Sequence, residues 1–181
     1  MASIIKANEL QDFGGNSILT SDGAGVVTPN ATGIKNTPAF HVSKTTANQS
    51  LSDNTNAKVT FDTELFDSDN NFASNKFTPT TAGKYYLYAQ AYLANNNPDI
   101  GTIELAIYKN GSLVAFHQHD HRTEMVGYNQ VPNIMTIVDA NGSSDYFEVY
   151  AKADVTSASS LQVYGLADGY TYFNGYKLIG A

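Results

Sequence analysis

Cysteine and tryptophan are both absent from the 181 residues, and charged residues make up only 15% of them. Without cysteine the chain has no disulfide and no thiolate chemistry, so its stability must come from a core or from the assembly of subunits. Lys and Arg together number 10, they form no basic stripe, and the net charge is −7. Nucleic acids and anionic membrane surfaces are bound through clustered cations, and we therefore expect neither as a partner.

Long apolar runs are also missing from the sequence. No run approaches the roughly 20 residues that span a bilayer. The opening residues Met1–Glu9 lack the basic region followed by an apolar region that marks a secretory signal. These absences predict a soluble protein without membrane insertion and without use of the general secretory route.

What the chain has instead is a pattern of short strands from Pro38 onward. Its 12 Tyr and 9 Phe suit strands better than helices. Asn110-Gly111 separates two β-rich runs, which predicts a hairpin, and apolar and polar residues alternate along Gly83–Leu93. Strands are expected at Ala39–Thr45, Lys58–Phe61, Phe72–Thr78, Gly83–Leu93, Thr102–Lys109, Ser112–His119, Ile134–Asp139, Tyr146–Ala153, Leu161–Tyr164 and Tyr170–Ile179. About ten antiparallel strands without a convincing helix predict an all-β jelly-roll β-sandwich over residues 38–181.

Residues 1–37 differ from the rest because glycine and proline interrupt them every few positions. The short apolar pieces between these breaks are too small to bury a core. Two interpretations stay open: a mobile tail, or an extended arm that becomes ordered on another protein. For the second, the residues expected to dock are Ile4, Ile5, Leu10, Ile18 and Leu19.

Several strand residues occur in a characteristic order. They are Phe61-Asp62, Phe72, Phe77-Thr78-x-x-x-x-Gly83-x-Tyr85-x-Leu87, Tyr108-Lys109-Asn110-Gly111 and Phe173-x-Gly175-x-x-Leu178. In this spacing they resemble the globular head of complement subcomponent q, a family related in fold to the tumour necrosis factor superfamily. The resemblance covers residues 38–181 and implies a ten-stranded jelly roll that forms compact homotrimers. The sequence departs from the family at Asn75, where glycine is usual, and residues 1–37 contain no collagen-like repeat.

The N-terminal residues carry a second resemblance. The segments are Ser3–Gln11, Gly14-Gly15-Asn16 and Ile18–Gly25. They are similar to N-terminal segments of virion proteins from marine tailed bacteriophages, in which such a segment joins an appendage to the particle. This resemblance implies a structural protein of a bacteriophage virion, made in the host cytoplasm. It would be a trimeric tail fibre, tail appendage or capsid-surface decoration protein that contacts the host surface, through a glycan or a protein, or contacts other virion proteins.

Signs of catalysis are scarce, and we expect no enzyme activity and no cofactor. The sequence lacks a Gly-x-Ser-x-Gly nucleophile elbow. The one constellation of ligand-type residues is His117, His119 and His121, which would share one face of a strand and could bind a structural metal ion. A polar strand face is the simpler interpretation. The alternatives to a virion protein are a metal-dependent enzyme that uses these histidines and a cellular carbohydrate-binding or adhesion module.

The aromatic residues of two strands suggest where subunits meet. One side of Gly83–Leu93 carries tyrosines and no charged residue between Tyr86 and Tyr92, although a surface in water normally carries charges. Tyrosine combines a large apolar ring with a polar tip and suits interfaces. The residues expected at the trimer interface are Tyr86, Tyr88, Tyr92, Tyr172 and Tyr176. The alternative is a platform on which sugars stack.

Overall fold

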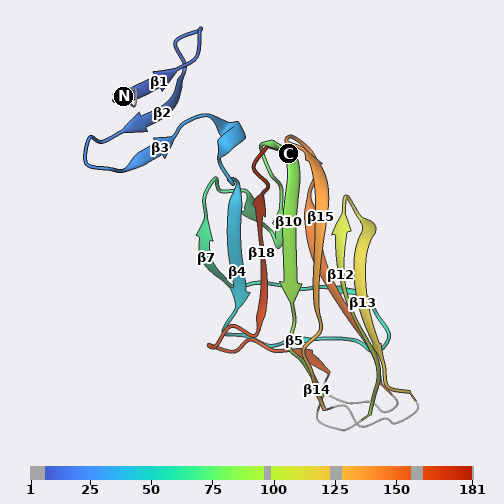
Figure 1. Ribbon diagram of the computed structural model, residues 1–181. Coiled ribbons are helices and arrows are strands. Elements are labelled where there is room, and N and C mark those ends of the chain that lie inside the picture. Colours follow the sequence, from blue (N-terminus) through green and yellow to red (C-terminus); the bar gives the residue numbers. More distant parts are fainter. Residues whose placement is uncertain (1–6, 96–98, 123–127, 156–160, 181) are drawn as a thin grey trace, which may run out of the picture.

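The computed structural model of the protein describes residues 7–95, 99–122, 128–155 and 161–180 (Figure 1). A small three-stranded sheet is followed by a larger β-sandwich, and the described residues include a single short 3-10 helix, η1 (Thr32–Ile34). None of the described residues form a helix that is long and apolar enough to cross a membrane. The prediction of an all-β protein is confirmed.

The strands fall into three groups. Those of the small sheet are β1 (Glu9–Gln11), β2 (Ser17–Ser21) and β3 (Val27–Pro29). The long strands of the sandwich are β4 (Ala39–Lys44), β7 (Thr63–Asp67), β10 (Ala82–Gln90), β12 (Ile100–Lys109), β13 (Ser112–Asp120), β15 (Asn133–Asn141), β16 (Phe147–Val155) and β18 (Thr171–Lys177). The short ones are β5 (Gln49–Ser50), β6 (Ala57–Lys58), β8 (Phe72–Ala73), β9 (Lys76–Phe77), β11 (Leu93–Ala94), β14 (Asn129–Gln130) and β17 (Gln162–Val163).

Two antiparallel sheets enclose the core of the sandwich. We call the sheet with the order β15-β10-β18-β4-β7 the inner sheet, and the sheet with the order β13-β12-β16-β9-β8 the outer sheet. A third sheet, β14-β11-β17-β5, lies at the end of the sandwich remote from η1 (Figure 1). Neighbouring strands that are distant in sequence, such as β10 with β18 and β12 with β16, give the non-local pairing of a jelly roll.

Alternation with a period of two places the core between the inner and outer sheets. Tyr85, Leu87 and Ala89 of β10 are fully buried, whereas the residues between them are partly exposed. Aromatic rings fill one end of the core, where the centroids of Phe40 and Phe77 lie 4.2 Å apart. Alternation in the sequence thus correctly identified the buried side of β10.

Close packing of two strands explains why the family-like pattern has a glycine at position 175. A Cβ atom at this position of β18 would lie 2.5 Å from Leu87 Cδ2 and 2.7 Å from the carbonyl oxygen of Tyr86. Both distances are too short for ordinary contacts, so only glycine lets β18 approach β10 this closely. The same two strands carry most of the tyrosines expected at the interface.

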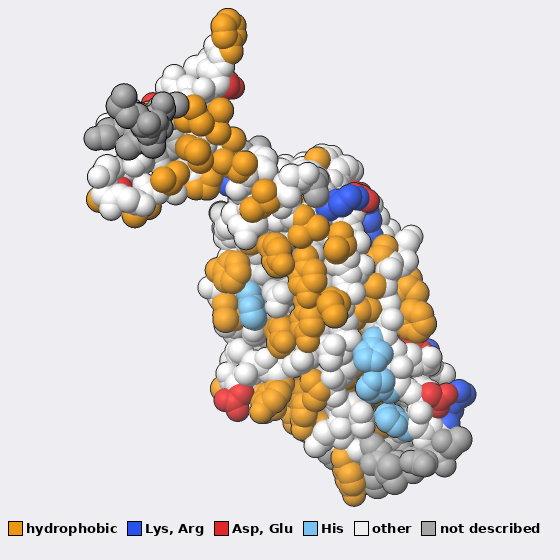
Figure 2. Space-filling model, in the orientation of Figure 1, with side chains coloured by type: hydrophobic (Ala, Val, Ile, Leu, Met, Phe, Trp, Pro, Cys, Tyr) orange, Lys and Arg blue, Asp and Glu red, His pale blue; other side chains and the backbone are white. Residues whose placement is uncertain are grey.

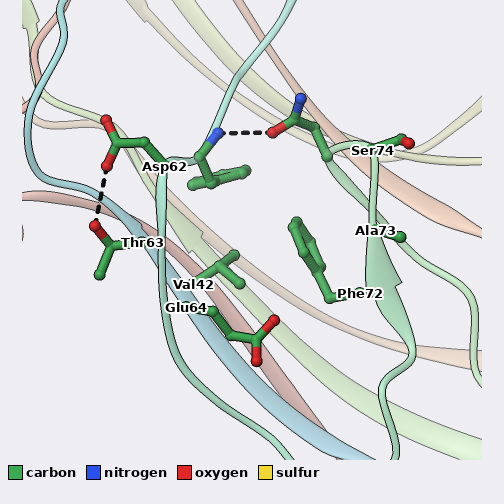
Figure 3. Close-up of a pocket in the computed structure, with 9 residues that line it drawn as sticks. Val42, Asp62, Thr63, Glu64, Phe72, Ala73 and Ser74 are labelled. Atoms are coloured by element: carbon green, nitrogen blue, oxygen red, sulfur yellow. Dashed lines mark hydrogen bonds between the residues drawn. The ribbon is translucent and has the colours of Figure 1, made fainter.

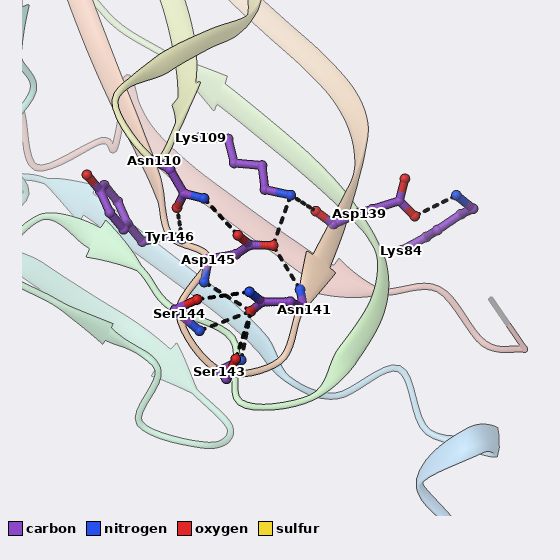
Figure 4. A network of polar contacts seen from close by, with 9 residues as sticks. All are labelled: Lys84, Lys109, Asn110, Asp139, Asn141, Ser143, Ser144, Asp145 and Tyr146. Carbon is purple, nitrogen blue, oxygen red and sulfur yellow. Dashed lines mark hydrogen bonds and ion pairs between the residues drawn. The ribbon is translucent and has the colours of Figure 1, made fainter.

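Two loops at the η1 end of the sandwich are joined by a polar network (Figure 4). The carboxylate of Asp145 lies 2.9 Å from Lys109 Nζ and accepts hydrogen bonds from Asn110 Nδ2 at 2.7 Å and from the Asn141 N–H at 2.9 Å. The Lys109 and Asn110 contacts lower the pKa of Asp145, which keeps it ionised. The side-chain oxygen of Asn141 in turn accepts the backbone N–H groups of residues 143–145. The predicted Asn110-Gly111 turn is confirmed, with positive φ at both residues.

Several strand predictions need correction. The strand expected at Phe72–Thr78 is a hairpin of β8 and β9, because Ser74 and Asn75 take positive φ values of 53° and 58° and reverse the chain. The strand expected at Gly83–Leu93 ends at Gln90. Strand β7, an edge strand of the inner sheet, was not predicted, since Thr63–Asp67 has no clear alternation.

The N-terminal residues are more ordered than expected. Instead of an extended arm, residues 9–29 form an antiparallel meander in which β2 pairs with both β1 and β3. None of its described residues is buried. In Figure 1 this N-terminal meander stands away from the sandwich and is joined to it through η1. The described residues therefore include a second structured unit whose apolar side chains have no core.

Candidate interaction surfaces

Four of the five predicted interface tyrosines lie together on the side of the inner sheet that faces away from the core. The rings of Tyr86 and Tyr176 lie 5.4 Å apart, and those of Tyr88 and Tyr172 lie 5.6 Å apart. Met135 and Ile137 of β15 continue this surface, because they pair directly with Tyr88 and Tyr86. We call the surface formed by these six residues the tyrosine face.

The tyrosine face is exposed and carries no charge of its own. Ile137 is 60% exposed, Met135 65% and Tyr176 41%. Figure 2 shows this surface as a hydrophobic band along the middle of the sandwich, with charged side chains only near its margins. At the upper margin Lys84 and Asp139 neutralise each other at 2.6 Å. Contiguous exposed apolar surfaces of this kind are typical of contacts with proteins, membranes or ligands.

Histidine 41 extends the tyrosine face onto β4. Its ring stacks on that of Tyr172 at 5.4 Å and lies 6.3 Å from the ring of Phe66. Burial lowers the pKa of His41 below its ordinary value, so the imidazole is neutral at pH 7. Beside it lies a hollow of about 390 Å³ whose walls include Leu65 and Asp168.

Tyr92, the fifth predicted tyrosine, lies beyond the last pair of β10 with β18 and outside the six residues of the tyrosine face, and its place in an interface stays a prediction. Strand β10 ends at Gln90, but the alternation of burial continues, with Ala91 and Leu93 buried and Tyr92 between them partly exposed. Its ring packs against Tyr164 at 5.5 Å and Tyr170 at 5.8 Å. The chain then continues into β11, which belongs to the third sheet.

The three predicted histidines lie in a row on β13 and the residue after it. The ring centroids of His117 and His119 are 4.5 Å apart, and those of His119 and His121 are 5.8 Å apart. His117 Nδ1 lies 2.6 Å from the carbonyl oxygen of Asn133 on β15. Within the described residues no three His, Cys, Asp or Glu side chains are arranged to hold a metal ion. The shared face is as expected, and the metal site stays a prediction.

The apolar side chains of the N-terminal meander gather on one side. Leu10 pairs with Leu19, which pairs with Pro29, and Val27 lies two residues before Pro29 on the same side. Leu10 is 53% exposed and Val27 is 57% exposed. Ile18 points to the opposite side of β2 because successive residues alternate. The predicted docking residues Ile4 and Ile5 lie outside the described residues.

The sequence analysis missed Phe13, which is fully exposed in the turn between β1 and β2. The turn is closed by Asp12, whose carboxylate accepts hydrogen bonds from the backbone N–H of Asn16 at 2.9 Å and from its side-chain amide. The contacts with Asn16 lower the pKa of Asp12. The signal in the sequence was an isolated Phe between Asp12 and two glycines.

A pocket of about 300 Å³ opens at the edge of the sandwich between β7 and β8 (Figure 3). Its floor includes Val42 and Phe72, and Glu64 extends its carboxylate toward Phe72. Partial burial favours a higher pKa for Asp62, but hydrogen bonds from the N–H and hydroxyl groups of residues 45–47 outweigh it and lower that pKa well below its ordinary value. Asp62 therefore acts as a fixed structural anion that ties the 45–47 loop to the start of β7.

Comparisons with known proteins support this fold. No family model and no curated protein matches the sequence. Murine APRIL superposes with a TM-score of 0.55 at 13% identity, covering 77% of this chain and 98% of its own. The globular domain of zebrafish complement 1qA gives 0.53 at 17% identity, covering 78% and 97%. Eiger TNF from S. frugiperda gives 0.53 at 14% identity, covering 79% and 93%.

These likenesses bear out the resemblance of the strand pattern. The protein has the jelly-roll fold of the tumour necrosis factor and complement q globular domains. At such low identities the likeness concerns the fold alone, and a fold does not fix a function. The function must be argued from the surfaces.

Proposed function

We propose that the protein is a trimeric structural component of a bacteriophage particle, placed in a tail fibre, tail appendage or capsid-surface decoration. Its task is to bind and assemble, at the host surface or between neighbouring particle proteins. The observation that carries the assembly part is the uncharged tyrosine face on the inner sheet. The phage context rests on the resemblance of the N-terminal segments.

The tyrosine face is suited to a homotrimer. Aromatic and Met side chains are enriched in the cores of interfaces, where charged residues are depleted. Tyr86, Tyr88, Met135 and Ile137 have this composition, and they lie on two adjacent strands of a rigid sheet. Closed cyclic symmetry is usual for homo-oligomers, and three copies around one axis would cover all three tyrosine faces at once.

The N-terminal meander is suited to docking on another particle protein. A three-stranded sheet needs an apolar face packed on something to be stable, and the side with Leu10 and Leu19 has no cover within the described residues. Phe13 at the tip supplies an aromatic anchor. In this arrangement the sandwich forms the trimer, and the N-terminal meander attaches the trimer to another particle protein.

Two measurements test this function together. Light scattering on the purified protein should give three times the subunit mass of 19.5 kDa. Mass spectrometry of purified particles should find the wild-type chain, and a Phe13→Ser, Leu19→Ser variant should still be trimeric but absent from particles. A stable monomer would contradict the proposed trimer. A trimer that is never found in particles would favour the alternative of a cellular adhesion module.

A further inference from the structure

The outer sheet presents a second aromatic surface, on the side opposite the core and remote from the tyrosine face. Phe116 of β13, Ala106 of β12 and Tyr150 of β16 are direct neighbours across the three strands. Phe116 is 57% exposed. Tyr108, the next residue on this side of β12, packs its ring 4.6 Å from that of Tyr150. We call these four residues the aromatic platform.

Polar groups border the aromatic platform along the strands. On one side, Glu104 Oε1 accepts a hydrogen bond from Gln118 Nε2 at 3.3 Å and lies 3.2 Å from Lys152 Nζ. On the other side, Glu148 Oε1 lies 3.2 Å from Lys58 Nζ. The aromatic rings are thus bordered by two charge pairs, and Lys58 lies directly beside Tyr150 and Glu148 directly beside Tyr108. Each pair is internally neutral but still presents N–H donors and carboxylate acceptors.

We propose that the aromatic platform binds an uncharged pyranose ring of a host-surface glycan. A pyranose has an apolar C–H face that stacks on aromatic rings, and hydroxyl groups around its rim that both donate and accept hydrogen bonds. Residues two apart on a strand are separated by about 7 Å, so a cluster of rings bordered by charge pairs matches the size of an apolar sugar ring with a polar rim. Because the border charges cancel in pairs, the surface offers no net charge for an ionic ligand.

The polar border is ordered before any ligand arrives. The side chains of Lys152 and Glu104 are 24% and 25% exposed, so both are held against the sheet rather than free in solvent. The hydroxyl of Tyr108 accepts a hydrogen bond from Asn56 Nδ2 at 3.1 Å. Groups that are already fixed lose little conformational entropy on binding, which favours affinity for a small ligand.

The platform also stays accessible in the proposed assembly. The tyrosine face and the aromatic platform lie on different sheets with the core between them, so covering the first leaves the second open. A second copy is a poor occupant of the platform, because its charged border would have to be desolvated against an uncharged tyrosine face. This sugar would be the host-surface ligand in the proposed function, and the biological role of the platform rests on that function.

Saturation-transfer NMR on the purified full chain tests the proposal. The probes are methyl β-D-glucopyranoside, methyl β-D-galactopyranoside and methyl α-D-mannopyranoside, with N-acetylneuraminic acid as an anionic probe. Saturation should reach the ring C–H protons of at least one neutral glycoside, and binding should be unchanged between about 0.05 M and about 0.5 M NaCl. Phe116→Ala and Tyr150→Ala should each weaken binding about tenfold.

Phe13→Ala is the matched control, because it removes an exposed phenyl ring from the N-terminal meander, and it should bind like the wild type. Phe116 is mostly exposed, so its replacement should leave melting unchanged and any loss of binding is then local. The proposal is overturned if no neutral glycoside receives saturation, if only N-acetylneuraminic acid does, or if both platform variants bind normally. Light scattering on the same samples reports the trimer separately, so glycan binding by a monomer would refute the proposed assembly and leave this inference standing.

Discussion

Replacing Ile137 with alanine tests the tyrosine face with little risk to the subunit, because this side chain is 60% exposed and lies outside the core. Full burial of an isoleucine side chain contributes about 2 kcal/mol. Assembly would bury only the part that the sheet leaves exposed, so the substitution should cost about 1 kcal/mol per subunit. A homotrimer contains three copies of the substitution, so its assembly loses about 3 kcal/mol. This loss corresponds to about a 100-fold lower trimer association constant.

Sedimentation equilibrium over a dilution series measures this effect. Because three subunits dissociate together, a 100-fold change in the association constant raises the concentration of half-dissociation about tenfold. Leu113→Ala is the matched control, since Leu113 is 50% exposed on β13 of the outer sheet. The reasoning fails if both variants dissociate at the same concentration, or if the wild type already sediments as a 19.5 kDa monomer at micromolar concentration.

Three further predictions concern the core, the loop network and pH. Gly175→Ala should lower the free energy of unfolding by about 1–3 kcal/mol in urea titrations, because the new Cβ collides with β10; unchanged stability would show that β18 moves freely. Because the pKa of Asp145 is lowered in the fold, its carboxylate contributes stability above the unfolded pKa of about 3.9, and this contribution is lost as pH falls through the lower folded pKa. Asp145→Asn should therefore be less stable than wild type at pH 7, and the difference should shrink as pH falls below about 3.9; a constant difference would contradict this. The lowered pKa of His41 favours the neutral imidazole in the folded subunit, so the free energy of unfolding should fall as pH drops below the unfolded pKa of about 6.5, and His41→Gln should reduce that dependence in urea titrations.

Local patterns in the sequence identified what local physics decides. Alternation along β10 correctly placed Tyr85 and Leu87 in the core, since one side of a sheet strand is buried and the other is not. The Asn110-Gly111 turn followed from the positive φ that both positions need. The order of strand residues gave the fold family, and the fold comparisons agree.

What the sequence did not reveal depends on non-local pairing. Nothing in the run from Tyr86 to Tyr92 shows that the chain leaves the inner sheet after Gln90, because the change is set by the pairing of β11 with β17. The aromatic platform was missed for the same reason. Phe116 and Tyr150 are far apart in the sequence and become neighbours only because β13 and β16 flank β12. Pairing between strands distant in the chain has no local signal.

The placement of charges gives a last prediction, about salt. Each subunit carries a net charge of −7, yet none of the six residues of the tyrosine face is charged, and Lys84 and Asp139 at its margin form a pair. An interface stabilised by ion pairs weakens in salt, whereas apolar contacts do not, and salt screens the repulsion between subunits of like charge. The trimer should therefore hold equally well or better when NaCl is raised from about 0.05 M to about 0.5 M. If sedimentation shows that salt dissociates the trimer, charged residues make the contact, and the subunits meet through a surface other than the tyrosine face.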